Sequence, residues 1–78
     1  MITIYKTDGC PWCEKAIKYI QSKGHEVNIV NCNTDPEHYR KILIEKTRQS
    51  SVPVIEVGDV TIIGFDRKMI DVALMEED

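Results

Sequence analysis

The stretch Asp8-Gly9-Cys10-Pro11-Trp12-Cys13 places two cysteines one helical turn apart, directly after a short apolar run. Pro11 suits the first position of a helix, where its missing N–H is no loss. Cys10 is then expected at the N-cap and Cys13 at the third helical position. The pattern predicts a helix over residues 11–23. The apolar face of this helix would hold Cys13, Ala16, Ile17 and Ile20.

The hydrophobic pattern on either side predicts further strands and helices. In chain order we expect a strand at 2–5, the helix at 11–23, a strand at 27–30, a helix from about 36 to 46, strands at 54–57 and 60–63, and a last helix that follows Asp66 and precedes a frayed acidic tail at 76–78. This order is βαβαββα and indicates an α/β domain. The first crossover makes its two strands parallel, whereas the Gly58-Asp59 turn makes the last two antiparallel.

The second long helix has two alternative start signals. Thr34 and Glu37 fit a capping box. Asp35 fits the N-cap instead if Pro36 takes the first helical position.

Size, charge and cysteine count limit the function classes. A chain of 78 residues predicts one domain, over 1–78, and we expect a monomer. The net charge of −3 argues against nucleic acid as a partner, since binding phosphates needs a basic face. No secretory signal is visible and no apolar run approaches the ~20 residues that cross a bilayer, so no membrane partner is expected. Three cysteines do not form a disulfide framework, which favours a cytoplasmic protein whose thiols are kept reduced.

The predicted position of the cysteine pair gives the two sulfurs different chemistry. The free N–H groups of the first turn and the positive end of the helix dipole favour a thiolate at Cys10, the form that attacks a disulfide. Cys13 lies one turn further in, where desolvation keeps it protonated until it is needed. Cys10 can therefore attack first, and Cys13 can then displace the reduced substrate. Lys6 or Lys15 would add positive charge near Cys10, while Glu14 acts against it.

Other uses of a Cys-x-x-Cys pair remain as alternatives. Zinc usually takes four ligands, yet only Cys32, His25 and His38 remain, scattered singly, so we expect no metal site. An iron–sulfur cluster shared between two chains, a structural disulfide and a redox-inert binding module are the other candidates. At a strand-to-helix junction the spacing is typical of dithiol–disulfide cycling, which we take as the leading hypothesis.

Val52-Pro53 directly precedes a predicted strand. The proline is either an ordinary loop residue or the cis residue of a tight turn. A cis proline beside Cys10 would leave the backbone of Val52 free to pair with an incoming peptide as a short added strand.

Gly64-Phe65-Asp66 separates the last strand from the last helix. Its simplest interpretation is a helix start, with Asp66 as the cap and Phe65 in the core. The N–H groups of such a helix start can also hold a substrate carboxylate. Trp12 is expected to be exposed beside the cysteines, where it either contacts a partner or covers the sheet edge.

Cys-Pro-Trp-Cys at 10–13, Ser-Val-Pro at 51–53 and Ile-Gly-Phe-Asp at 63–66 together resemble the glutaredoxin family of the thioredoxin superfamily. The resemblance implies a thioredoxin-like fold with a four-stranded mixed sheet of order 2-1-3-4, three flanking helices and a cis peptide before Pro53. It also implies a thiol–disulfide oxidoreductase that reduces protein disulfides or glutathione mixed disulfides. Cys10 would be the nucleophile and Cys13 the resolving thiol.

The resemblance further implies glutathione as a co-substrate, and this is where the sequence departs from the family. Family members usually carry Lys or Arg three residues before the first cysteine, where this chain has Thr7. Ile63 replaces a family glycine, and Arg67 follows Asp66 where a second acidic residue is common. The residues expected to contact substrate or glutathione are Lys6, Trp12, Val52, Pro53, Gly64 and Asp66.

Residues 63–70 are more similar to the small NrdH-type redoxins. Proteins of that type usually take electrons from thioredoxin reductase and pass them to ribonucleotide reductase. The expected partners are therefore disulfide-bearing proteins, with glutathione, thioredoxin reductase or both as reductant, and ribonucleotide reductase as a candidate acceptor.

Overall fold

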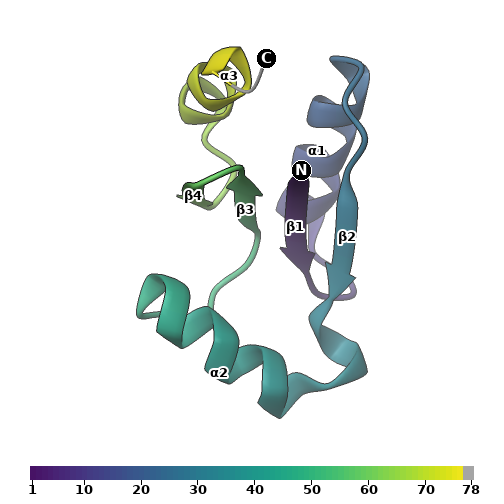
Figure 1. Ribbon diagram of the computed structural model, residues 1–78. Helices are drawn as coiled ribbons and strands as arrows, with labels where there is room; N and C mark the ends of the chain where they lie inside the picture. Colours follow the sequence, from purple (N-terminus) through teal and green to yellow (C-terminus); the bar gives the residue numbers. More distant parts are fainter. Residues whose placement is uncertain (77–78) are drawn as a thin grey trace.

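The computed structural model describes residues 1–76 of the chain (Figure 1). The elements are β1 (Ile2–Lys6), α1 (Pro11–Ser22), β2 (Asn28–Asn31), the 3-10 turn η1 (Cys32–Thr34), α2 (Pro36–Thr47), β3 (Val54–Val57), β4 (Val60–Ile63) and α3 (Arg67–Glu76). The predicted order βαβαββα is confirmed, with η1 as an addition. From residue 77 on, the expected acidic tail lies outside the described residues.

The four strands form one mixed sheet in the order β2-β1-β3-β4. β1 pairs in parallel with β2 and antiparallel with β3, and β3 and β4 form the antiparallel hairpin. Ile4 of β1 lies opposite both Ile29 of β2 and Ile55 of β3. This is the thioredoxin-like sheet of order 2-1-3-4 that the family resemblance implied.

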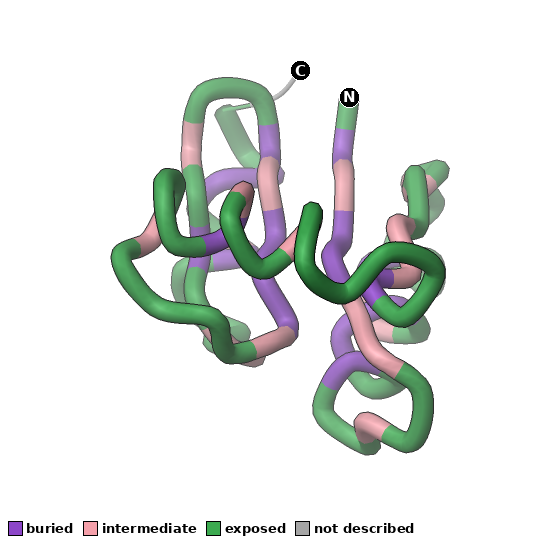
Figure 2. The backbone as a smooth tube through the Cα atoms, turned by 90° about the horizontal axis from the view of Figure 1, so that it is seen from below, coloured by how far each residue is buried: buried purple, intermediate pink, exposed green. Residues whose placement is uncertain are grey.

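Side chains that alternate along the strands divide the core between the two faces of the sheet. Ile4 and Ile55 pack with α1 and α3, whereas Tyr5 and Val54 pack with Leu43 of α2. The buried residues gather along the strands and on the helix faces turned toward them (Figure 2). Burying each isoleucine contributes about 1.5–3 kcal/mol, and the first of these clusters, which includes Ala16, Ile17 and Ile20, holds α1 against the sheet.

The structure shows which of the two predicted start signals α2 uses. Asp35 is the N-cap, its carboxylate accepts from the N–H of His38, and Pro36 takes the first helical position. The Thr34 hydroxyl instead donates to the carbonyl of Asn31, so the capping box does not form.

The second strand begins at Asn28, one residue later than predicted. Val27 packs against the core from the connection that precedes it. Within residues 1–76, no helix combines the length and hydropathy that crossing a bilayer requires.

Candidate active site

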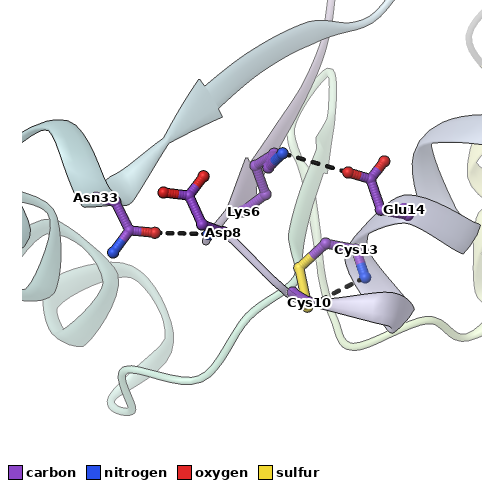
Figure 3. The surroundings of a disulfide bond; sticks show 6 residues. All are labelled: Lys6, Asp8, Cys10, Cys13, Glu14 and Asn33. Carbon is purple, nitrogen blue, oxygen red and sulfur yellow. Dashed lines mark hydrogen bonds and ion pairs between the residues drawn. A yellow bond between two sulfur atoms is a disulfide. The ribbon is translucent and has the colours of Figure 1, made fainter.

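A polar clasp anchors the loop that joins β1 to α1. The Asp8 N–H donates to Oδ1 of Asn33 over 2.6 Å, and Nδ2 of Asn31 donates to Oδ1 of Asp8 over 3.0 Å. The N–H of Asn33 in turn donates to Oδ1 of Asn31 over 2.9 Å. Asp8 and Asn33 lie together at the base of this loop (Figure 3). The clasp fixes the loop to the end of β2, and this gives Cys10, the N-cap of α1, a defined position.

Cys10 is the N-cap of α1, with Pro11 at the first helical position, as predicted. Its Sγ accepts a hydrogen bond of 3.2 Å from the N–H of Cys13, and its carbonyl accepts one of 3.2 Å from the N–H of Glu14. The two cysteines are joined as a disulfide, with Cα atoms 5.3 Å apart (Figure 3). When the bond is reduced, the same N–H is placed to stabilise a Cys10 thiolate.

Burial distinguishes the two sulfurs. Cys10 is partly exposed, whereas Cys13 is fully buried at 0% exposure on the core face of α1. An incoming disulfide can therefore reach Cys10, while Cys13 is placed to attack Cys10 from within.

The lysines that were expected to add charge at Cys10 have other partners. The Nζ atom of Lys6 pairs with Oε1 of Glu14 at 3.3 Å, which neutralises both groups (Figure 3). The Nζ atom of Lys15 lies 4.5 Å from the centroid of the Trp12 ring, a cation–π contact. Neither lysine donates a hydrogen bond to Cys10, whereas the N–H of Cys13 at the helix start does.

Beside the cysteine pair, an open depression of about 300 Å³ is built around a cis proline. The peptide between Val52 and Pro53 is cis, as the resemblance implied. The Pro53 carbonyl accepts a 2.8 Å hydrogen bond from the Gly64 N–H, which joins the turn before β3 to the connection after β4. The depression is lined by Trp12, Val52, Pro53, Gly64 and Phe65.

Four of the predicted contact residues thus meet in this depression, namely Trp12, Val52, Pro53 and Gly64. Trp12 is 58% exposed, so the expected exposure beside the cysteines is confirmed.

Lys6 and Asp66 do not line this depression. Lys6 is held by Glu14, and the Asp66 carboxylate caps α3 by accepting from the Met69 N–H over 3.1 Å.

Sequence reasoning missed two residues that each line a depression together with Val52, namely Phe65 and Arg40. Phe65 is half-buried rather than fully in the core, and its ring centroid lies 6.2 Å from that of Trp12. Arg40 of α2 lines a second depression of about 170 Å³ together with Thr7 and Val52. It therefore places a cation near Thr7, where the usual basic residue is missing. The sequence pattern of α2 did not single out Arg40, because its proximity to Thr7 depends on how α2 packs against another element.

Cys32 also lines this second depression but is 6% exposed, and its thiol is free. Burial raises the pKa of this thiol, against a smaller lowering by a backbone hydrogen bond from Lys6. It therefore stays protonated at neutral pH, in keeping with a small residue at the core edge. In residues 1–76, no group of three or more His, Cys, Asp or Glu side chains is arranged to hold a metal ion.

Comparison with known proteins agrees with this geometry. A family model described as glutaredoxin matches residues 2–62, a range that contains both cysteines and the cis proline. A glutaredoxin-like 8.6 kDa protein from the rubredoxin operon of Clostridium pasteurianum is 39% identical over 71 residues, which is 91% of this chain and 93% of that one. The glutaredoxin of Pseudomonas aeruginosa is 34% identical over 65 residues, covering 83% and 76% of the two chains.

Among solved structures, the chain resembles the NrdH-redoxin of Escherichia coli, described as a glutaredoxin-like protein with a thioredoxin-like activity profile. The TM-score is 0.76 at 28% identity, with 91% of each chain covered.

Proposed function

Because the chain belongs to the glutaredoxin family, we propose that it is a thiol–disulfide oxidoreductase that reduces protein disulfides and glutathione mixed disulfides through Cys10 and Cys13. One observation carries this proposal: the accessible sulfur caps a helix, and the second sulfur is buried within bonding distance of it. Exchange of this kind operates in a reducing compartment, and we place the protein in the cytoplasm.

The proposed cycle begins with both cysteines reduced. The Cys10 thiolate attacks one sulfur of the substrate disulfide and forms a mixed disulfide, while the other substrate sulfur leaves as a thiolate and takes up a proton. Cys13 then loses its proton and attacks Cys10, which releases the second substrate thiol. The substrate gains two electrons and two protons, and the protein ends with the Cys10–Cys13 disulfide.

The leading candidate for the reductant is glutathione, used as a co-substrate. Two glutathione thiols would reduce the Cys10–Cys13 disulfide and leave as glutathione disulfide. Support comes from the turn at Val52 and cis-Pro53, whose backbone suits an extended peptide. The Arg40 guanidinium in the neighbouring depression suits a peptide carboxylate and takes the place of the cation that position 7 lacks.

The second candidate reductant is thioredoxin reductase, with ribonucleotide reductase as the acceptor, as in the NrdH-type redoxins. Two features favour it. The first is the charge around position 7: Thr7 carries no charge, and the charge of Lys6 is neutralised by Glu14. Neither residue therefore offers a free cation to a glutathione carboxylate. The similarity to the NrdH-redoxin of Escherichia coli extends over 91% of both chains.

A coupled assay distinguishes the two routes. A small amount of the protein, with an excess of a protein disulfide as the electron acceptor, is offered either glutathione with glutathione reductase, or thioredoxin reductase, each with NADPH, and NADPH oxidation is followed. The glutathione proposal expects turnover in the first mixture that drops several-fold in Arg40→Gln, with Lys41→Gln on the same helix as the matched control. Turnover only in the second mixture would replace glutathione by thioredoxin reductase, and turnover in neither would refute the oxidoreductase proposal.

A further inference from the structure

A row of three aromatic rings leads away from the cysteine pair across α1 toward α3. The Trp12 and Phe65 ring centroids are 6.2 Å apart, and those of Phe65 and Tyr19 are 5.7 Å apart in an edge-to-face contact. The Tyr19 hydroxyl donates to Asp71 of α3, which fixes the far end of the row. Phe65 and Tyr19 are only half-buried, so part of each ring stays available for contact.

Beyond Trp12 this row forms the floor of an open depression of about 490 Å³, here called the basic groove. Its lining residues are Lys15, Lys18, Tyr19, Ser22, Phe65 and Arg67. Phe65 also lines the depression at cis-Pro53, so the two depressions are neighbours on either side of one side chain. A chain segment that extends from the cis proline past Phe65 would enter the basic groove.

The cations of the groove, Lys15, Lys18 and Arg67, are exposed, and none of them forms an ion pair with a carboxylate of the described residues. The Asp71 carboxylate accepts from the Tyr19 hydroxyl and pairs with Lys23. The hydrogen bond from Tyr19 lowers the pKa of Asp71 most, and Arg67 also lowers it at longer range, so the charge of Arg67 is partly compensated. The guanidinium carbon of Arg67 lies 5.1 Å from the Tyr19 ring centroid, which leaves the edge of the guanidinium free to donate hydrogen bonds.

This local excess of positive charge stands out on a chain whose net charge is −3. A surface that is positive on an acidic protein attracts negative partners selectively, because the rest of the molecule repels them.

We propose that the basic groove binds an acidic segment that flanks the redox-active cysteines of the partner protein. The proposal rests on the oxidoreductase function, since it assigns a docking site to the substrate of the Cys10–Cys13 pair. Aspartate or glutamate side chains of the segment pair with Lys18 and Arg67, and an apolar residue packs on the exposed parts of Phe65 and Tyr19. The aromatic floor favours a peptide over a bare phosphate, because it offers contact area that a peptide side chain fills.

The test uses two disulfide-bridged peptides of the same sequence, flanked by either Asp and Glu or by Asn and Gln. Their reduction is followed by stopped-flow fluorescence with the full-length reduced protein. The acidic peptide is expected to react about three- to tenfold faster at low salt, because it forms exposed ion pairs that the neutral peptide lacks. The advantage should shrink near 0.15 M salt, where charges are screened beyond about 8 Å.

Two double variants, each of which removes two positive charges, test whether the preference for the acidic peptide comes from the groove. Lys18→Gln/Arg67→Gln should remove the preference, whereas Lys41→Gln/Arg48→Gln, at exposed positions of α2 and its C-cap, should retain it. Lys18→Glu/Arg67→Glu should reverse it in favour of a peptide flanked by Lys and Arg, a result that mere loss of stability cannot produce.

The outcomes separate the two proposals. Equal rates for both peptides with wild-type protein would overturn the groove and leave the oxidoreductase function intact, whereas failure to reduce either peptide would overturn the function itself. An equal loss of glutathione disulfide reduction in Lys18→Gln/Arg67→Gln would assign the groove to glutathione. Inhibition of the acidic-peptide reaction by an oligonucleotide at matched charge would assign the groove to polyanions in general. Assignment of the groove to glutathione or to polyanions would overturn the proposal.

Discussion

The N–H of Gly64 donates a 2.8 Å hydrogen bond to the carbonyl of Pro53. This bond joins the cis-proline turn to the connection before α3, and so places Val52 and Phe65 in the same depression beside Trp12. Gly64 makes the connection with φ of +83°, in the left-handed region that favours glycine.

Gly64→Ala should therefore destabilise the protein through its backbone alone. A Cβ at this position meets no atom within 4 Å, so steric contact contributes nothing. We expect a loss of about 1–2 kcal/mol in the free energy of unfolding, measured by urea denaturation. Gly64→Asn is the matched control and should lose less, since asparagine tolerates this region. Equal losses in the two variants would show that backbone conformation is not the cause.

Replacing each cysteine of the pair separates the two steps of the cycle. Cys10→Ser should abolish reduction of a protein disulfide, because it removes the only accessible sulfur of the pair. Cys13→Ser should retain the one-cysteine route through a glutathione mixed disulfide and lose the two-cysteine route. Both activities are measured with the reduced proteins, and thermal melts verify that the variants fold. Full activity in Cys10→Ser would be incompatible with the proposed cycle.

Cys32 should react slowly with alkylating agents although it carries a free thiol. Its pKa is raised by burial, so little thiolate is present at neutral pH. Iodoacetamide should modify Cys10 first in the reduced protein, with modification sites identified by mass spectrometry of peptides. Preferential modification of Cys32 would contradict the burial argument.

The same shift predicts a change of stability at alkaline pH. The folded state binds the Cys32 proton more tightly than the unfolded chain does, because its folded pKa is the higher one. The associated stability is complete below the unfolded pKa of about 8.5 and is lost as pH rises through the folded value. Cys32→Ala should therefore show a smaller alkaline loss of unfolding free energy than wild type. Parallel pH profiles for the two proteins would count against this assignment.

The clasp at the base of the active-site loop can be tested through Asn33, whose Oδ1 accepts the N–H of Asp8. Asn33→Ala removes this acceptor and should cost about 1 kcal/mol of stability. Hydrogen exchange at the Asp8 amide should become faster. Asn28→Ala is the control, because its amide makes only a 3.5 Å contact with the exposed Thr3 hydroxyl. Unchanged exchange at Asp8 in Asn33→Ala would show that the clasp does not hold the loop.

Features that depend on neighbouring residues along the chain could be predicted from the sequence. Pro11 directly after Cys10 fixes the helix start, and Asp66 caps α3 through a residue three positions on. Strand order and the cis peptide at Pro53 came from the family resemblance and are confirmed.

Contacts between distant elements could not be predicted in this way. The pairing of Lys6 with Glu14 depends on how the loop between them folds, and Arg40 comes near Thr7 only once α2 packs on the sheet. Lys6 and Glu14 were expected to act separately on Cys10, and Arg40 looked like an ordinary surface residue of its helix. The row from Trp12 to Tyr19 was missed for the same reason, because Phe65 completes it from the other end of the chain.

The proposed function depends on the first turn of α1 holding the sulfur of Cys10 as an anion. Titration of the thiolate absorbance of the reduced Cys32→Ala variant, with the absorbance of the Cys10→Ser/Cys32→Ala variant subtracted, measures the pKa of Cys10. We expect a pKa below about 8.5, the value for free cysteine. A pKa at or above about 8.5 would show that the helix start does not stabilise the thiolate.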